Sequence, residues 1–322
     1  MAGMIINRII FSFTLYSLNH MISESFKRIH HEISKAYIGD STTISALAIA
    51  MFTGGHVLLE GIPGLAKTTL AKALAQTLAA DFHRIQFTMD LMPMDITGSN
   101  IYRIHDGSFS FIPGPVFTNV LLADEINRAS ARTQSALLEA MQENQVSVDG
   151  KTYSLPNPFF VIATQNESDE RGTWPLPDSE LDRFMFRIRM TYPSSQQEQR
   201  IIMLSAQPDP VISPVLSIDE FLRYRQEIQN VRVSETIATY ITMLIRQTRK
   251  EPDILRGASP RAGAMLLKAA RGSAFLQGSE FVTPDHVRDV ITLVLNHRLI
   301  LAPDAPPVDE IIQRIVAKVP FK

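Results

Sequence analysis

Residues 56–75 read HVLLEGIPGLAKTTLAKALA and combine an apolar run, a glycine-containing loop and a helical repeat. The run Val57 to Leu59 is typical of a buried parallel strand. After the loop, Leu70 and Leu74 recur at a spacing of four residues, which places them on one face of a helix. A strand, a glycine loop and a helix in this order are the parts of a phosphate-binding loop.

The loop departs at one position from the phosphate-binding pattern G-x-x-x-x-G-K-[ST]. Gly61 and Gly64 are present, but Ala66 stands where the second glycine of the pattern is expected. Because the residue before the lysine enters the helix and alanine is the best helix former, we expect Ala66 to have helical angles. Lys67 would then neutralise the β- and γ-phosphates, and the Thr68 hydroxyl would ligate Mg²⁺. The alternative is an ordinary strand, turn and helix.

Two later apolar runs also end in polar residues. Val120–Ala123 is followed by Asp124 and Glu125, and Phe159–Ala163 is followed by Thr-Gln-Asn, which ends at Asn166. Ligands bind at the carboxyl ends of strands in an open parallel sheet. Asp124 can hold Mg²⁺ through water, and Glu125 can activate a water that attacks the γ-phosphate. The alternatives are an acidic helix cap for the first pair and turn chemistry for the second group.

Composition sets broad limits on the protein. The 322 residues suggest about two domains, and a net charge of −2 gives no sign of a polyanionic partner. The chain has no cysteine, which excludes disulfides and thiolate metal sites and is compatible with a cytoplasmic location.

Residues 1–20 differ in character from the rest. Their apolar run is too short for a membrane span and is followed by no cleavage site. We therefore expect a poorly ordered N-terminal extension or a misplaced start, and no stable membrane insertion.

Six segments together carry a family resemblance: GIPGLAKT, RIQFTMDLMPMDITG, LLADEINRA, TQSALLEAMQE, FFVIATQN and LPDSELDRF. The chain resembles the MoxR family of AAA+ ATPases from about Tyr37 to Pro193, and more weakly beyond. Alanine at position 66 is what this resemblance leads one to expect. The stretch Ser168–Arg171 departs from the family pattern, which often has proline nearby, and this leaves the path of that loop open.

The resemblance implies roles for individual residues. Asp124 and Glu125 correspond to the Walker B pair, Asn166 to sensor 1, Arg183 to the arginine finger and Arg261 to sensor 2. From the sequence alone, an ion pair of Arg183 with Asp182 or Glu180 is the alternative, and a surface arginine is the alternative for Arg261. The Walker A loop, expected to bind ATP, comprises Gly61, Ile62, Pro63, Gly64, Leu65, Ala66, Lys67, Thr68 and Thr69.

The expected fold is α/β, with a parallel sheet between helices over residues 21–193 and an all-helical lid over residues 194–322. Asp106-Gly107 and Asp149-Gly150 lie between alternating runs and predict two β-hairpins. By resemblance, both hairpins are inserts that face a ring pore; surface decoration is the alternative. Amphipathic stripes fill the lid, where Thr283 is the expected N-cap of one helix.

By resemblance, the protein is an ATPase that uses ATP and Mg²⁺. It is expected to form a ring, typically a hexamer, that remodels protein clients with a partner carrying a von Willebrand factor A domain. A nucleic-acid motor is the main alternative, but the hairpins carry few basic residues, Arg103 and Lys151 among them, and phosphate-driven binding needs more. A scaffold that does not hydrolyse ATP is a third reading, against which Lys67, Asp124 and Glu125 argue.

Overall fold

The computed structural model describes residues 22–105, 107–166 and 173–321, and their contacts divide into two compact units. The sheet unit comprises Glu32–Thr43 and Gly54–Ile218. The helical unit comprises residues 22–31, 44–53 and 219–321. The expected N-terminal extension over residues 1–20 and the departure at Ser168–Arg171 lie outside the described residues. The domain boundary at residues 193 and 194 stays a prediction.

A five-stranded sheet in the order β2-β5-β8-β1-β9 forms the centre of the sheet unit, and all its strand pairs are parallel. The strands are β1 (Val57–Glu60), β2 (Phe82–Gln86), β5 (Val120–Asp124), β8 (Phe160–Gln165) and β9 (Phe186–Arg189). The helices of this unit are α3 (Lys67–Thr77), α4 (Pro93–Thr97), the 3₁₀ turn η1 (Ile126–Arg128), α5 (Ala131–Glu143), α6 (Asp178–Leu181) and α7 (Ser195–Ser205).

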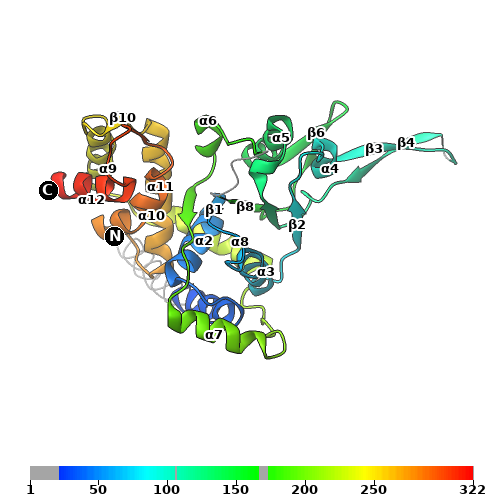
Figure 1. Cartoon of the computed structure of the whole chain (residues 1–322), viewed down its shortest axis with the longest axis horizontal. Helices are drawn as coiled ribbons and strands as arrows, with labels where there is room; N and C mark the ends of the chain where they lie inside the picture. Colours follow the sequence, from blue (N-terminus) through cyan, green and yellow to red (C-terminus); the bar gives the residue numbers. More distant parts are fainter. Residues whose placement is uncertain (1–21, 106, 167–172, 322) are drawn as a thin grey trace, which may run out of the picture. The chain divides into compact units, whose positions relative to one another are not determined.

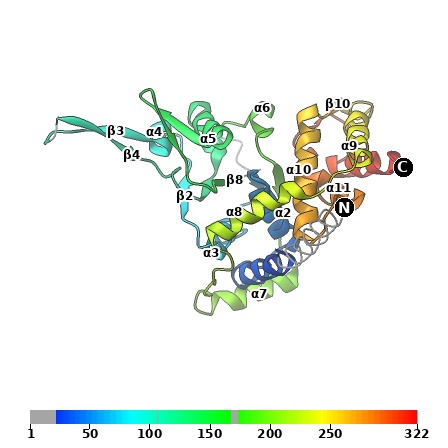
Figure 2. The same cartoon turned by 180° about the vertical axis from the view of Figure 1, so that it is seen from behind.

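The apolar runs that predict strands form the inner strands β1, β5 and β8. Their side chains are buried on both faces, as a parallel sheet between helices requires. Leu121 and Val161 pack against Leu137 and Met141 of α5. The helix α3 lies on the opposite side of the sheet from α5 (Figures 1 and 2). The predicted α/β layering is confirmed.

Both Asp-Gly hairpins predicted from the sequence are confirmed. Their strands are β3 (Gly98–Arg103) with β4 (Ser108–Pro113), and β6 (Gln145–Val148) with β7 (Lys151–Ser154). Asp149 and Gly150 alone join β6 to β7, and both have positive φ, as the tightest hairpin turn demands. The β3–β4 loop is longer and spans residues 104–107, of which Asp106 lies outside the described residues. This hairpin extends away from the five-stranded sheet (Figure 1).

The helical unit packs aromatic and aliphatic side chains into its own core. Its helices are α2 (Ser41–Thr53, which belongs to this unit from Ile44), α8 (Ile218–Glu227), η2 (Ile228–Asn230), α9 (Glu235–Thr248), α10 (Pro260–Leu276), α11 (Pro284–Leu295) and α12 (Val308–Lys318). Gly272 lets α10 approach α2 closely, because a Cβ there would lie 2.5 Å from Thr53 Cγ2. The expectation of an all-helical lid needs one correction: β10 (Ile254–Arg256) and β11 (Ile300–Leu301) form a short antiparallel pair.

Candidate functional site

The loop that joins β1 to α3 depends on two glycines with positive φ angles. Gly61 has a φ of 150° and Gly64 a φ of 87°. A Cβ on Gly61 would lie 2.7 Å from the Met190 carbonyl oxygen, so only glycine fits at this approach. The loop leads into the first turn of α3, whose unpaired N–H groups and helix dipole favour an anion. The loop and the helix therefore form a site suited to phosphate.

Ala66 has a left-handed backbone, with φ 55° and ψ 29°, and is the N-cap residue of α3. The expectation of helical angles at this position is therefore wrong. A left-handed conformation costs an L-residue about 1–2 kcal/mol, which glycine would not incur. Ala66 is exposed, so its Cβ has room. The loop keeps the backbone of the glycine pattern and tolerates the strain of a Cβ.

Lys67, the first residue of α3, is buried, with 8% of its surface exposed. Its ammonium group donates to the Gly61 carbonyl oxygen at 2.5 Å and to Asn166 Oδ1 at 3.4 Å. These two contacts hold a positive charge against the loop, between its first glycine and the end of β8. Thr68 and Thr69 follow in the first turn of α3, the former half-buried and the latter exposed.

Asp124 ends β5 and is held by two neighbouring strands. The Thr164 hydroxyl donates to Asp124 Oδ1 at 2.5 Å. Arg84, on β2, donates to Asp124 Oδ2 from Nη2 at 2.7 Å and from Nε at 3.1 Å. A carboxylate held from both sides has a fixed orientation at the carboxyl edge of the sheet.

Glu125 leaves β5 with a left-handed backbone, φ 57°. Its backbone N–H donates to Thr164 Oγ1 at 2.9 Å. Its carboxylate accepts hydrogen bonds from Asn166 Nδ2 at 3.0 Å and Gln86 Nε2 at 2.9 Å, and pairs with Arg128 Nε at 2.8 Å. Because Asn166 also contacts Lys67, a continuous chain of hydrogen bonds links Lys67, Asn166 and Glu125.

Three side chains of this cluster were not identified from the sequence: Arg84, Gln86 and Arg128. Arg84 and Gln86 share one face of β2, which lies at the edge of the sheet. The register places Gln86 directly opposite Asp124. Two long polar side chains at a spacing of two on a short strand were a weak signal. Their role depends on the pairing of β2 with β5, which local sequence does not specify.

The two arginines expected at the site lie on other elements than the residues of this cluster. Arg183 follows α6, and its backbone N–H donates to the Glu180 carbonyl oxygen at 3.1 Å. Within the described part of the chain, its side chain forms no ion pair with Asp182 or Glu180, the partners considered from the sequence. Arg261 is exposed in the first turn of α10, in the helical unit.

A cavity of about 430 Å³ adjoins the loop within the sheet unit. Tyr37, Ile38 and Gly39 line it, as do Tyr192 and Pro193. The loop residues that line it are Ile62, Pro63, Gly64, Leu65 and Ala66. Burial raises the pKa of Tyr37 above its ordinary value. A cavity of this size, with aromatic and apolar walls next to a phosphate loop, fits a nucleobase. The sequence alone did not indicate a base-binding role for Tyr37, Tyr192 and their neighbours.

No cluster of three or more His, Cys, Asp or Glu side chains that could hold a metal occurs in the described residues. Asp124 supplies one carboxylate at the carboxyl end of β5, and Mg²⁺ usually binds one or two carboxylates together with phosphate oxygens and water. Asp124 and Thr68 are the side chains that would hold it.

Comparison with known proteins identifies the family. The model described as "ATPase family associated with various cellular activities (AAA)" matches residues 56–186, and the AAA lid domain matches residues 246–316. Chaperone MoxR1 of Mycobacterium tuberculosis is 40% identical over 301 residues, which cover 91% of this chain and 80% of MoxR1. The chain belongs to the MoxR family of AAA+ ATPases.

Two further relatives of this MoxR-family chain resemble it over most of its length. Protein YeaC of Bacillus subtilis is 43% identical over 281 residues, which cover 87% of this chain and 88% of YeaC. A crystal structure of a protein assigned as an ATPase from Cytophaga hutchinsonii matches with a TM-score of 0.88 and 40% identity. That match covers 95% of this chain and 97% of the other. Nucleotide binding is the property that membership of the AAA+ class implies for the phosphate loop. In the described residues, no helix is both long and apolar enough to cross a membrane.

Proposed function

We propose that this chain is a Mg²⁺-dependent ATPase that works in an oligomeric ring, typically a hexamer, to remodel protein clients. The observation that carries the proposal is the chain of contacts from Lys67 through Asn166 to Glu125. It connects a phosphate-binding cation to a carboxylate that can take a proton from water. A cytoplasmic location remains part of the proposal.

Hydrolysis would proceed by attack of water on the γ-phosphorus. Glu125 accepts the proton of that water as the new P–O bond forms and the bond to the β,γ-bridging oxygen breaks, which releases ADP and phosphate. Lys67 and the loop N–H groups bind the β- and γ-phosphates. Mg²⁺ held by Asp124 and Thr68 would neutralise charge on the phosphates. Asn166 would orient the water and Glu125 together.

The proposal assigns client contact to the β3–β4 hairpin. Its large apolar side chains are exposed: Ile101 by 48%, Tyr102 by 53%, Ile104 by 87%, Phe109 by 72% and Ile112 by 47%. Apolar residues grouped on one exposed element mark interaction sites. In a ring this hairpin would bind unfolded or flexible segments of the client protein. The partner expected from the family resemblance is a protein with a von Willebrand factor A domain.

A nucleic-acid motor is the second candidate. The apolar surface of the β3–β4 hairpin does not favour it, because nucleic-acid affinity comes mainly from lysine and arginine contacts to phosphate. Salt-sensitive binding to single-stranded or duplex DNA would support this candidate over a protein remodeller.

Substitutions at Glu125 and Lys67 test the ATPase assignment. Glu125→Gln should bind ATP but lower the hydrolysis rate by about 10²–10⁴-fold, since the water loses its general base. Lys67→Ala should instead weaken ATP binding, because the buried cation at the loop is lost. Phosphate release measures the first effect, and equilibrium binding of a fluorescent ATP analogue measures the second.

Glu139→Gln is the matched control, because Glu139 is an exposed glutamate on α5 outside the cluster. It should hydrolyse ATP at the wild-type rate. Wild-type turnover by Glu125→Gln would show that another group is the base.

A further inference from the structure

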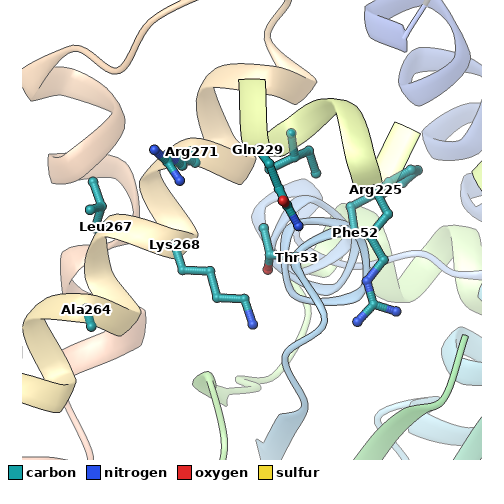
Figure 3. Close-up of a pocket in the computed structure, with 9 residues that line it drawn as sticks. Phe52, Thr53, Arg225, Gln229, Ala264, Leu267, Lys268 and Arg271 are labelled. Carbon is teal, nitrogen blue, oxygen red and sulfur yellow. The ribbon is translucent and has the colours of Figure 1, made fainter. Parts of the chain in front are cut away.

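The helical unit contains a cavity of its own, with a volume of about 360 Å³, that shares no residue with the phosphate loop. Its walls come from the end of α2, from α8 and η2, and from α10 (Figure 3). The residues used below are Phe52, Thr53, Arg225, Gln229, Lys268 and Arg271. The nucleotide chemistry proposed above uses none of these residues.

Three cations line the cavity: Arg225 on α8, and Lys268 and Arg271 on α10. No aspartate or glutamate occurs among the described residues of its lining. The side chains of Lys268 and Arg225 extend in the same direction past the end of α2 that carries Thr53 (Figure 3). The cavity therefore concentrates positive charge in a space large enough for a ligand.

Burial disfavours the charged forms of two of these side chains, Lys268 and Arg225. Partial burial, followed by repulsion from Arg225, lowers the pKa of Lys268 below its ordinary value. Burial likewise lowers the pKa of Arg225. A bound anion would reverse both effects, because an opposite charge nearby favours the protonated form of a base.

The hydrogen-bonding groups of the cavity are mostly donors. Arg271 Nε is buried and has no hydrogen-bond partner among the described residues. The exposed Gln229 can offer its amide N–H₂. The Thr53 hydroxyl already donates to the Ile49 carbonyl oxygen at 2.6 Å, so its proton is used within α2. Guanidinium and ammonium groups around one space match the several oxygens of a phosphate.

We propose that this cavity binds a multivalent phosphate anion of the size of pyrophosphate or tripolyphosphate. The ligand need carry no base, because the Phe52 ring is fully buried, with its centroid 4.6 Å from that of Phe221, and cannot offer a face for stacking. The phosphate groups can be those of a free polyphosphate or those of a second nucleotide. The site would give the helical unit a ligand that is independent of ATP hydrolysis.

The test uses the full chain with its phosphate loop saturated by ADP. Isothermal titration with sodium tripolyphosphate should show one further site, and its affinity should fall as the salt concentration rises. A parallel titration with additional nucleotide distinguishes the two sources. Tighter binding of tripolyphosphate identifies a free polyphosphate as the ligand, and tighter binding of the nucleotide identifies the phosphate groups of a second nucleotide. If neither ligand binds a further site, the proposal is overturned.

Variants locate the site. Lys268→Gln combined with Arg271→Gln should weaken tripolyphosphate binding by about ten- to hundredfold per lost charged contact. Arg223→Gln is the matched control, because Arg223 is an exposed arginine on α8 outside the cavity, and it should bind as the wild type does. Wild-type affinity in the double variant, or an equal loss in Arg223→Gln, would contradict the assignment.

Thermal unfolding gives a second measurement. Tripolyphosphate should raise the Tm of the wild type and leave that of the double variant unchanged. Without the anion, the double variant should be no less stable than the wild type, since the Lys268 charge that Arg225 repels is removed. If the double variant does not fold, the single change Lys268→Gln takes its place, because Lys268 is not one of the buried core residues.

Discussion

Ala66 adopts the backbone conformation that the phosphate loop needs, although this conformation is unfavourable for alanine. The phosphate loop needs a left-handed residue before Lys67, and this chain supplies it with an alanine at φ 55°. The strain is stored beside the candidate nucleotide site, where the direction of the loop N–H groups matters more than local stability. Glu125 has a left-handed backbone as well, so two residues of the site depart from the usual conformations of L-residues.

Ala66→Gly should therefore increase the free energy of unfolding by about 0.5–1 kcal/mol, since the relief of strain exceeds the extra entropy that glycine gives the unfolded chain. Urea denaturation measures this change. Ala238→Gly, at an exposed position inside α9, is the control and should lower the free energy of unfolding by about 1 kcal/mol. If both changes destabilise the protein equally, residue 66 does not have a left-handed backbone in solution.

At the scale of the element, the two hairpins differ in what fixes them. The β6–β7 hairpin packs against the β3–β4 hairpin through Tyr153, whose ring stacks on Phe111 with centroids 3.9 Å apart. Asn100 Nδ2 donates to Asp149 Oδ2 at 2.7 Å, which ties the base of the β3–β4 hairpin to the other turn. Phe111 of β4 also packs on Phe117, with ring centroids 5.6 Å apart. Farther out along the hairpin, Tyr102 and Phe109 pack on each other at 5.3 Å. The outer half of this hairpin is thus separable from the fold.

Replacing residues 102–109 by Asn-Gly should leave basal ATP hydrolysis unchanged and abolish client remodelling. Ile101 and Ser110 are register partners, so a two-residue turn can join them and keep the Phe111–Tyr153 contact. Phosphate release and a client-unfolding assay measure the two activities. A full-length control with Ile104→Ser and Phe109→Ser tests whether the apolar side chains, rather than hairpin length, bind the client. Loss of folding in the shortened chain would favour a structural role.

The N-terminus of α11 contains a pH-sensitive cap. Thr283 Oγ1 accepts from the His286 N–H at 3.4 Å, and His286 Nδ1 accepts from the Thr283 N–H at 3.0 Å. Burial lowers the pKa of His286 below its ordinary value, and the charges of Asp289 and Asp285 oppose this only in part. Protonation of Nδ1 would remove the acceptor on which the cap depends.

Because the pKa of His286 is lower in the folded state, the unfolded chain binds more protons once the pH falls below about 6.5, and stability is lost there. His286→Gln keeps a capping acceptor, so its stability at pH 7.5 should be within about 1 kcal/mol of the wild type. Between pH 7.5 and 5.5 the wild type should lose more unfolding free energy than this variant. Parallel loss in the two proteins would exclude His286 as the source.

At the scale of the whole molecule, Arg84 and Arg128, the other cations described in the cluster besides Lys67, are already paired with Asp124 and Glu125. Arg183 forms no ion pair with its neighbours Asp182 and Glu180 in the described residues, and its role in a neighbouring subunit stays a prediction. An arginine supplied by a neighbour in a ring would stabilise the charge of the transition state and make hydrolysis depend on assembly.

Arg183→Ala should bind ATP but hydrolyse it about 10³–10⁵-fold more slowly, as expected for an arginine finger. Mixing it with Glu125→Gln should restore part of the activity, because some interfaces then pair an intact Glu125 with an intact Arg183. Arg132→Ala, an exposed arginine on α5, should retain full activity alone. No recovery in mixed rings, with subunit exchange verified separately, would reject action across the interface.

The sequence by itself determined the features that depend on neighbouring residues. The apolar runs predicted the three inner strands, Asp-Gly predicted both hairpins, and Thr283 was the expected cap of α11. Lys67 followed from the phosphate-loop pattern, and Asp124, Glu125 and Asn166 followed from polar residues at strand ends, because parallel strands bring their carboxyl ends to one edge.

Only the tertiary structure decided the rest of the site. Arg84 and Gln86 reach Asp124 and Glu125 because β2 pairs with β5 in one register, across about forty residues of chain. The cation-lined cavity of the helical unit likewise gathers side chains from α2, α8 and α10. The left-handed angle of Ala66 is imposed by the loop against the preference of alanine. Such contacts arise from packing between distant segments, which local propensity and periodicity do not encode.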